Sequence, residues 1–323
     1  MATRAVDDKD QERGRRARSP AEIPARGWLD ILKRTFRRFS EDGILLVSAG
    51  VTFYGLLAIV PALAAFITLY GLFFDTAEIE QQARRISSIL PEGAVSVVHD
   101  QIKRVASHTR GSLQTTFALS TVLSLWSALA AVRSMIKALN IAYDEEENRS
   151  FLGLNFVALL FTFGGMIYLT VVLAGLAVAP MVLDFVGLES STGTLARLLR
   201  WPILVLLVLG AVSVLYRYGP SRKKPQWRWI TWGSAATAIG WLIFSLLFAW
   251  YVANFRNYDE THGSLGAIVV FMIWMWLSTT IVILGAELNA EVEHQTTHDT
   301  TGEGRAMGQR GATMADGIGE AQG

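Results

Sequence analysis

A run of uncharged residues near the C-terminal end constrains most strongly what this chain can fold into. From Leu265 to Gly285 no side chain is charged, and such a run is long enough to cross a bilayer core of about 30 Å as a helix. The end of the run carries Glu287, Asn289 and Glu291. An apolar helix with carboxylates and an amide in its last turns predicts a membrane span with a polar task at one end.

Composition extends this prediction to the rest of the chain. Of the 323 residues, 51% are hydrophobic, and they are gathered into long runs rather than spread at the spacing of a soluble core. The charged residues lie mostly in the tails and loops, so the net charge of +1 says nothing about nucleic acid. We predict an all-α, polytopic membrane helical bundle with about six transmembrane helices and additional interfacial amphipathic helices. Within a membrane domain of residues 44–294, the predicted spans are 44–74, 115–139, 154–183, 196–216, 230–252 and 265–288.

Both tails, residues 1–22 and 295–323, are predicted to be disordered because they are polar and lack apolar periodicity. The N-terminal stretch differs from a secretory signal peptide, and the first apolar run, from Ile44, is too long for one. We therefore expect that run to be retained as a span. The absence of cysteine excludes disulfides, thiolate catalysis and cysteine-based zinc sites.

Residues 23–43 predict a basic amphipathic helix. Its apolar face consists of Trp28, Ile31, Leu32, Phe36 and Phe39, and its basic face of Lys33, Arg34, Arg37 and Arg38. A helix of this kind lies in the interface of an anionic leaflet, so membrane lipids are the expected partner. A solvated helix packed on its own protein is the alternative.

The first span is followed by an outer loop, residues 75–112, that is too polar to cross the membrane. Asp75 to Glu78 resembles a capping box, and Pro91 suits the first turn of a second helix. We expect two short helices over the outer surface. Within the first span, Pro61 is expected to kink the helix or to divide it.

Two sets of side chains in the spans allow either packing or a binding groove. The second span carries a stripe of small hydroxyl residues, Ser120, Ser124 and Ser127, on one helix face. Close helix packing explains such a stripe, and a hydrated or headgroup-accepting groove is the alternative. Trp274 and Trp276 lie near the midpoint of the sixth span, away from the interface where tryptophan usually lies. They serve either packing or the lining of an amphiphile-sized groove.

Lysine and arginine define the expected orientation. Residues 1–43 contain eleven of them and the segment Arg217–Arg228 contains five, so the positive-inside rule places both segments in the cytoplasm. With six spans, the N-terminus and the C-terminus are then both cytoplasmic. The small residues Gly263, Ser264 and Gly266 form the outer end of the sixth span.

Three stretches together resemble one family of membrane proteins. They are SAGVTFYGLLAIVPALAAFITLYG at 48–71, LWSALAAVRSMIKALNIAYDEEENR at 125–149, and LYRYGP at 215–220 followed by a block at 229–293 with GSLGA and GAELNAE. In this order and spacing they resemble the BrkB/YihY family of bacterial inner-membrane proteins, formerly labelled ribonuclease BN. Two positions depart from its pattern, His262 before GSLG and Ser150 after Glu-x-Arg. The resemblance implies a multi-pass protein of the bacterial inner (cytoplasmic) membrane, linked to envelope integrity and to a proposed movement of lipids or amphiphiles.

Polar side chains gather near the predicted cytoplasmic ends of several spans. The predicted cluster consists of Arg133, Lys137, Asn140, Glu147, Arg149, Arg217, Glu287 and Asn289. Ionisable groups near a membrane core are usually paired or functional, so the alternatives are structural ion pairs and a headgroup site or gate. One specific hypothesis pairs Glu287 with Arg133 or Arg217.

No motif for enzyme chemistry accompanies these residues. Phosphodiester hydrolysis needs clustered metal ligands or a histidine pair with a cation. His294 and His298 are spaced for a metal beside Glu291, but they lie at the edge of a predicted tail without a positioned base. No phosphate loop, Ser-His-Asp set or RNA-binding module is present in the sequence. We expect no catalytic residue, cofactor, metal or nucleic-acid partner, so the residues do not support the ribonuclease label.

The function we expect from the sequence is that of a non-enzymatic transporter or facilitator of a lipid or other amphiphile, serving envelope integrity. Without a nucleotide-binding motif, such a protein would rely on passive or gradient-coupled movement. A structural or scaffolding membrane protein without transport is the alternative, and a ribonuclease is the weakest of the three hypotheses. Protein partners and oligomeric state are not predicted by the sequence.

Overall fold

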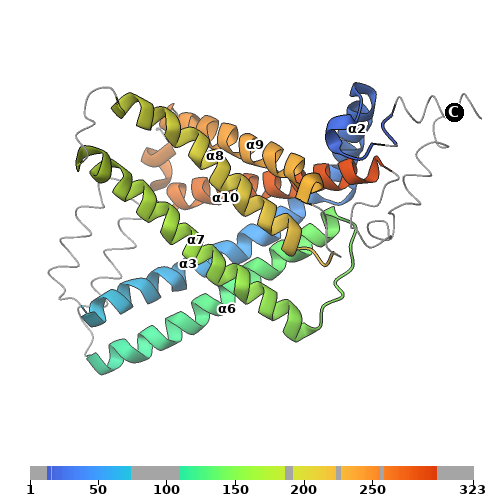
Figure 1. Ribbon diagram of the computed structural model, residues 1–323. Helices are drawn as coiled ribbons and strands as arrows, with labels where there is room; N and C mark the ends of the chain where they lie inside the picture. Colours follow the sequence, from blue (N-terminus) through green and yellow to red (C-terminus); the bar gives the residue numbers. More distant parts are fainter. Residues whose placement is uncertain are drawn as a thin grey trace, which may run out of the picture. The chain divides into compact units, whose positions relative to one another are not determined.

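A computed structural model describes residues 13–15, 17–73, 110–185, 192–222, 227–254 and 258–296 of the chain. In these ranges the regular structure is one short 3-10 helix and seven α-helices, without a strand. In chain order, and as labelled in Figure 1, they are η1 (Pro20–Glu22), α2 (Ala25–Glu41), α3 (Ile44–Phe73), α6 (Arg110–Ala142), α7 (Phe151–Phe185), α8 (Thr192–Tyr218), α9 (Trp227–Asn254) and α10 (Tyr258–His294). The prediction of an all-α protein is confirmed.

Six long helices, α3 and α6 to α10, correspond to the six stretches predicted to be spans, although residue 74 at the end of the first lies outside the described residues. Within the described ranges, four segments are long and apolar enough to cross a membrane: Ala118–Ala142, Phe151–Tyr168, Trp229–Val252 and Ile268–His294. The pair α2 and α3 adds a fifth if it is counted as one bent span, and the apolar part of α8, Pro202–Tyr218, is shorter. Large apolar side chains such as Phe156, Met166 and Leu247 are exposed, as expected for helices whose solvent is lipid.

The helices divide into two compact units. One comprises Met1–Val47, Met135–Ile243 and Thr280–Gly323, and the other comprises Ser48–Ser134 and Phe244–Thr279. Helices α3, α6, α9 and α10 each contribute one end to the first unit and the remainder to the second. Because the polar clusters described below all lie in the first unit, we call it the polar unit.

The orientation of α2 in the polar unit differs from that of an ordinary amphipathic helix. Its buried residues are Gly27, Ile31, Arg34, Thr35 and Arg38. On the other side Leu29, Leu32 and Phe36 are exposed, Phe36 by 79%. Two of the four residues of the predicted basic face, Arg34 and Arg38, are therefore turned into the protein, whereas Lys33 and Arg37 are exposed. Arg34 and Arg38 thus agree with the alternative interpretation, a helix packed on its own protein.

A short break separates α2 from α3. At the end of α2 the Asp42 N–H donates to the Arg38 carbonyl at 2.9 Å. Gly43 then adopts a left-handed backbone with φ of 59°, a conformation that glycine reaches without the steric cost of a Cβ. From Ile44 the chain continues as α3, which runs as one helix across Pro61 to Phe73. Pro61 thus does not divide the first span into two helices.

The segment before α2 is ordered against the end of α10. The Gln295 amide donates to the Arg13 carbonyl at 2.6 Å, and the Thr296 hydroxyl donates to the Ala17 carbonyl at 2.7 Å. Ala17 and Ile23 pack with Ile31, Trp229 and Val292 in a small apolar core. Residues 17–22 and 295–296 therefore differ from the predicted disorder, because side-chain hydrogen bonds from Gln295 and Thr296 to backbone carbonyls, together with apolar contacts, hold the two segments against each other.

Several predictions fall on residues that the structure does not describe. They are the outer-loop helices up to residue 109, residues 1–12 and 16 of the N-terminal tail, and the C-terminal tail from residue 297, which includes His298. The last three residues of the predicted outer loop, 110–112, belong to the start of α6.

Candidate functional site

The last three turns of α10 carry polar side chains on two opposite faces. Glu287, Glu291 and His294 repeat at i, i+4 and i+7 and share one face of the helix, whereas Asn289 and Glu293 repeat at i and i+4 on the other. All five are buried, with exposed fractions between 0% and 4%. Each face meets a different set of partners within the polar unit. We call the face with Glu287, Glu291 and His294 the α2 face of α10, and the face with Asn289 and Glu293 the tyrosine face of α10.

On the α2 face, Glu291 is held by two arginines from one helix. Arg34 Nε donates to Glu291 Oε2 at 2.5 Å, while its Nη2 donates to the Gln295 side chain at 2.7 Å and to the Glu291 carbonyl at 3.2 Å. Arg38 Nε lies 3.7 Å from the second carboxylate oxygen of Glu291. Because both guanidiniums are buried, these contacts supply the charge compensation that water cannot provide there.

Arg38 serves further carboxylates at the end of α2. Its guanidinium lies 3.5 Å from Asp42 and 3.9 Å from Asp144. Asp144, in the loop after α6, has a positive φ of 56°, which asparagine and aspartate tolerate better than most residues. Arg38 thus links α2, the α6–α7 loop and α10.

Glu287 belongs to the same face but has a different environment. It is 2% exposed, and its Oε2 has no hydrogen-bond partner among the residues that the structure describes. The charged groups that act on it most strongly are Asp42, Glu291, Arg38 and Asp144. The cation that acts most strongly on Glu287 is therefore Arg38, rather than Arg133 or Arg217 as hypothesised from the sequence.

The two arginines of that hypothesis have other surroundings. Arg133 Nε donates to the Leu129 carbonyl of its own helix at 3.2 Å, and the residue belongs to the second unit. The Arg217 guanidinium lies 4.5 Å from the Trp227 ring centroid and 5.5 Å from that of Tyr218. These half-exposed aromatic rings hold it by cation–π contact.

On the tyrosine face, Asn289 connects three elements. Its amide donates to the Tyr143 hydroxyl at 3.0 Å, and its carbonyl accepts the Gly233 N–H at 3.3 Å. Arg222 donates to Glu293 at 2.6 Å and lies 4.2 Å from the centroid of the Tyr143 ring. Burial raises the pKa of the Tyr143 hydroxyl, although the nearby Arg222 charge opposes this, so the group remains protonated and able to hydrogen bond.

One turn earlier, α9 and α10 approach closely. The Tyr216 hydroxyl donates to the Val282 carbonyl at 2.5 Å and lies 2.7 Å from the Thr237 hydroxyl. A Cβ on Gly285 would overlap the Thr237 side chain. The tyrosine face therefore requires glycine at position 285, because only hydrogen leaves room for the hydroxyl pair.

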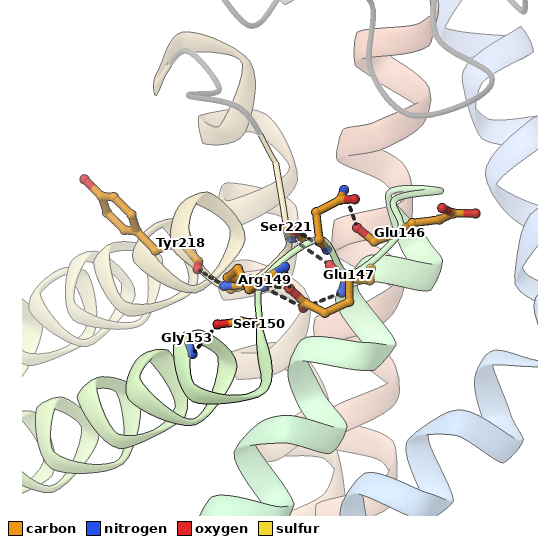
Figure 2. Close-up of polar contacts among 10 residues, drawn as sticks. Glu146, Glu147, Arg149, Ser150, Gly153, Tyr218 and Ser221 are labelled. Carbon is orange, nitrogen blue, oxygen red and sulfur yellow. Dashed lines mark hydrogen bonds and ion pairs between the residues drawn. The ribbon is translucent and has the colours of Figure 1, made fainter.

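A third group ties the loops after α6 and α8 together (Figure 2). Arg149 donates to both oxygens of Glu147 at 2.7 and 2.9 Å, and its Nη2 donates to the Gly219 carbonyl at 2.7 Å. Asn140 donates to Glu147 at 3.0 Å and accepts the Ser221 N–H at 2.8 Å. Partial burial would raise the pKa of Glu147, but the hydrogen bonds from Arg149 and Asn140 outweigh it and hold that pKa below its usual value.

The structure thus unites only part of the predicted cluster. Asn140, Glu147 and Arg149 form the loop group, while Glu287 and Asn289 lie on opposite faces of α10. Lys137 is exposed. The residues that the sequence interpretation left out are Arg34, Arg38, Asp42, Tyr143, Asp144, Arg222 and Glu293. A signal existed for some of them, since the carboxylates at 287 and 291 share a helix face and therefore call for cations on a facing helix.

The candidate groove residues lie in the second unit. Ser120 and Ser127 are 8% exposed and Ser124 is half-buried, so the serine stripe is on the packed side of α6. Trp274 and Trp276 are half-buried, and the Trp274 ring stacks on Phe271 at 5.9 Å between centroids. Gly266 is buried, whereas the surroundings of Gly263 and Ser264 lie outside what the structure describes.

Metal ligation is not supported by the described residues. No group of three or more His, Cys, Asp or Glu side chains in them is placed to hold a metal ion. His294 Nδ1 lies 3.9 Å from Glu291 Oε1, but that carboxylate already receives Arg34.

Comparison with known proteins identifies the family. The model of the family described as virulence factor BrkB matches residues 35–310. The chain belongs to the BrkB family. It is 31% identical over 266 residues to the ribonuclease-like protein YfkH of Bacillus subtilis, covering 81% of this chain and 94% of that protein. It is 27% identical over 268 residues to the UPF0761 membrane protein NMB0524 of Neisseria meningitidis, covering 80% of this chain.

The BrkB relatives differ in length from this chain. The matched region spans 62% of the Neisseria protein and 61% of the UPF0761 membrane protein RC1_0578 of Rhodospirillum centenum, to which the chain is 24% identical. No solved structure matches the chain. Family membership therefore establishes a membrane protein, and it leaves the activity to be inferred from the residues.

Proposed function

We propose that this BrkB-family protein is a non-enzymatic facilitator that moves a lipid or another amphiphile across the bacterial inner membrane. The observation that supports this proposal is the α2 face of α10, where Glu287, Glu291 and His294 are buried against Arg34 and Arg38. Ionisable side chains at the end of a membrane helix are costly, and they commonly mark substrate or ion pathways.

The position of α2 suggests that this contact is a gate. The helix exposes Leu29, Leu32 and Phe36 on one side and inserts Arg34 and Arg38 into the protein on the other. A helix with one face in lipid and the other in an ion-pair network can transmit a change in either environment to α10. A protein that served only as a scaffold would gain no evident advantage from burying these charges, since apolar residues of similar volume often stabilise as well.

Charge argues for a gate rather than a site for anionic headgroups. Even without Glu287, the carboxylates at this end of α10 and its neighbours, Asp42, Asp144 and Glu291, outnumber the guanidiniums of Arg34 and Arg38. An anionic headgroup would be repelled there. The exposed Lys33 and Arg37 of α2 are the residues suited to an anionic leaflet.

Ribonuclease activity finds little support in the geometry. Glu291 and His294, the pair that such chemistry would need, are 1% and 4% exposed, and Glu291 is bound by Arg34. A catalytic base held in an ion pair and closed to solvent cannot reach a phosphodiester.

The test is a lipid-movement assay with purified protein in vesicles that contain a fluorescent lipid. We expect the wild-type protein to equilibrate the probe between leaflets, and Arg34→Gln to change the rate severalfold because it loosens α2. Arg37→Gln is the matched control, since the ion pair that Arg37 makes among the described residues is with Glu41 on the exposed side of the same helix, at 3.7 Å with both side chains more than half exposed.

Failure of the wild-type protein to move the probe, with or without an ion gradient, would contradict the proposal. Repeated crosslinking of one protein partner in that case would favour the scaffold.

A further inference from the structure

Glu287 is the one buried carboxylate of the α2 face that receives no guanidinium contact among the described residues. Its exposed fraction is 2%, and Oε2 accepts no hydrogen bond from the described part of the chain. Glu291, one turn further along the same face, is contacted by Arg34 through one oxygen and by Arg38 through the other. Two guanidiniums thus contact the Glu291 carboxylate, whereas none from the described ranges contacts the carboxyl group of Glu287 one turn earlier.

The surrounding charges make ionisation of Glu287 unfavourable. Arg34, the first of the two cations on α2, is engaged by Glu291 and Gln295, and Arg38 is shared among Glu291, Asp42 and Asp144. His294, on the same face of α10, is directed to Glu291. A second negative charge on Glu287 would therefore add repulsion from three carboxylates without a cation of its own.

We propose that Glu287 is a proton-binding site, neutral in the structure described, and that release of its proton is coupled to the gate formed by α2. A proton is the ligand that fits, because one carboxylate oxygen suffices to hold it, and the described residues do not form a metal site of three or more side-chain ligands. The exchange is simple: the Glu287 carboxylic acid transfers its proton to water on the cytoplasmic side and becomes a carboxylate, and the reverse step restores it.

Proton release would act on Arg38. The new carboxylate competes for the guanidinium that now contacts Glu291, Asp42 and Asp144. A shift of Arg38 toward Glu287 weakens its links to the end of α2 and to the α6–α7 loop. The coupled role of this site in transport rests on the proposed function, whereas proton binding itself does not.

Infrared difference spectroscopy of the full-length protein in lipid at neutral pH tests proton binding. The wild-type minus Glu287→Gln spectrum should contain the carbonyl absorption of a protonated carboxylic acid. Glu293→Gln is the matched control on the same helix. Because Glu293 is ion-paired with Arg222 at 2.6 Å, its difference spectrum should contain the bands of an ionised carboxylate. Ionised bands in the Glu287 difference, or no protonated-acid absorption in the wild-type protein alone, would overturn the inference; the second result does not require the variant to fold.

Stability gives a second measurement with a definite sign. If Glu287 is protonated in the folded protein and ionised in the unfolded protein, the unfolding equilibrium constant rises by about tenfold for each pH unit in that range. Glu287→Gln should remove this dependence, so the melting temperature of the variant should gain on that of the wild type with rising pH. A difference that stays constant with pH contradicts proton binding.

The vesicle assay separates the two levels of the hypothesis. A proton gradient should accelerate probe movement severalfold in the wild type and leave Glu287→Gln unchanged. Equal gradient responses would refute the coupling while lipid movement stands. An inert wild-type protein would refute the proposed function, and the infrared result would still decide whether Glu287 binds a proton.

Discussion

At the scale of single residues, the role of each buried polar group depends on the contacts of each atom. Asn289 has the same exposure as an apolar core residue, 0%, yet it donates to Tyr143 and accepts from Gly233. An aspartate of nearly the same shape would lose the donor and place a second charge beside Glu293. The amide is therefore the chemical choice that satisfies both neighbours.

The loop residue Glu147 allows a pH prediction outside the membrane spans. Its pKa lies below the ordinary value of 4.5 in the folded protein, so its stabilising contribution is fully present above that value and is lost as the pH falls through the folded pKa. Glu147→Gln should destabilise the protein by about 1 kcal/mol or less, because the side chain is 25% exposed and solvent screens the pair. Thermal unfolding followed against pH measures this difference.

The neighbouring carboxylate is the control for that measurement. Glu146 is exposed to solvent, which screens its charge, and its backbone carbonyl accepts a hydrogen bond from the Asn148 side chain at 3.0 Å. Glu146→Gln should leave the melting curve almost unchanged. An equal loss in both variants, or a Glu147 effect that persists well below pH 4.5, would show that the ion pair is not its cause.

At the scale of secondary structure, α10 was predictable as a span but its partners were not. The uncharged run at 265–285 and the polar residues after it defined the helix and its special end. The facing cations were hidden because Arg34 and Arg38 belong to a helix whose pattern also fits a membrane surface. The sequence pattern indicates that the two sides of α2 differ in polarity. Only the tertiary contacts with α10 decide that the side bearing Ile31, Arg34 and Arg38 is turned inward.

The contact between α9 and α10 gives a prediction at this scale. Gly285→Ala places a Cβ against the Thr237 hydroxyl and 2.7 Å from that of Tyr216, so we expect a loss of about 1–3 kcal/mol from overpacking. Gly210→Ala in α8 is the control, since no described atom lies within 4 Å of the added Cβ, and the better helix propensity of alanine should stabilise the protein by up to about 1 kcal/mol.

Denaturant or thermal unfolding of the two glycine variants in detergent compares these effects. The double variant Gly285→Ala/Thr237→Ala should recover part of the loss, because the overlapping hydroxyl is removed. The steric explanation is refuted if Gly285→Ala is as stable as the wild-type protein.

At the scale of the whole molecule, contacts within the polar unit constrain how many times the chain can cross the membrane. The Asn148 N–H donates to Ser221, and Arg149 donates to the Gly219 carbonyl, so the loops after α6 and α8 meet. Arg222 then pairs with Glu293 at the end of α10. Since the ends of α6, α8 and α10 lie together, α7 with α8 must cross an even number of times, as must α9 with α10. If α7 spans the membrane, α8 does too, although its described apolar part is shorter than the other spans.

This parity can be measured because the chain has no cysteine of its own. Single cysteines at Glu146 and Ser221 should react with an impermeant maleimide only from the cytoplasmic side, the side expected from the arginine and lysine distribution. Cysteines at Thr192, where α8 begins, and at Asn254, where α9 ends, should react only from the opposite side. If Thr192→Cys and Ser221→Cys are labelled from the same side, α8 does not cross, and the membrane domain has fewer than six spans. If instead all four positions are labelled from exchanged sides, the span count holds and the assigned orientation is wrong. The labelling pattern tests the crossings of α7 to α9, whereas the direction rests on the positive-inside rule alone.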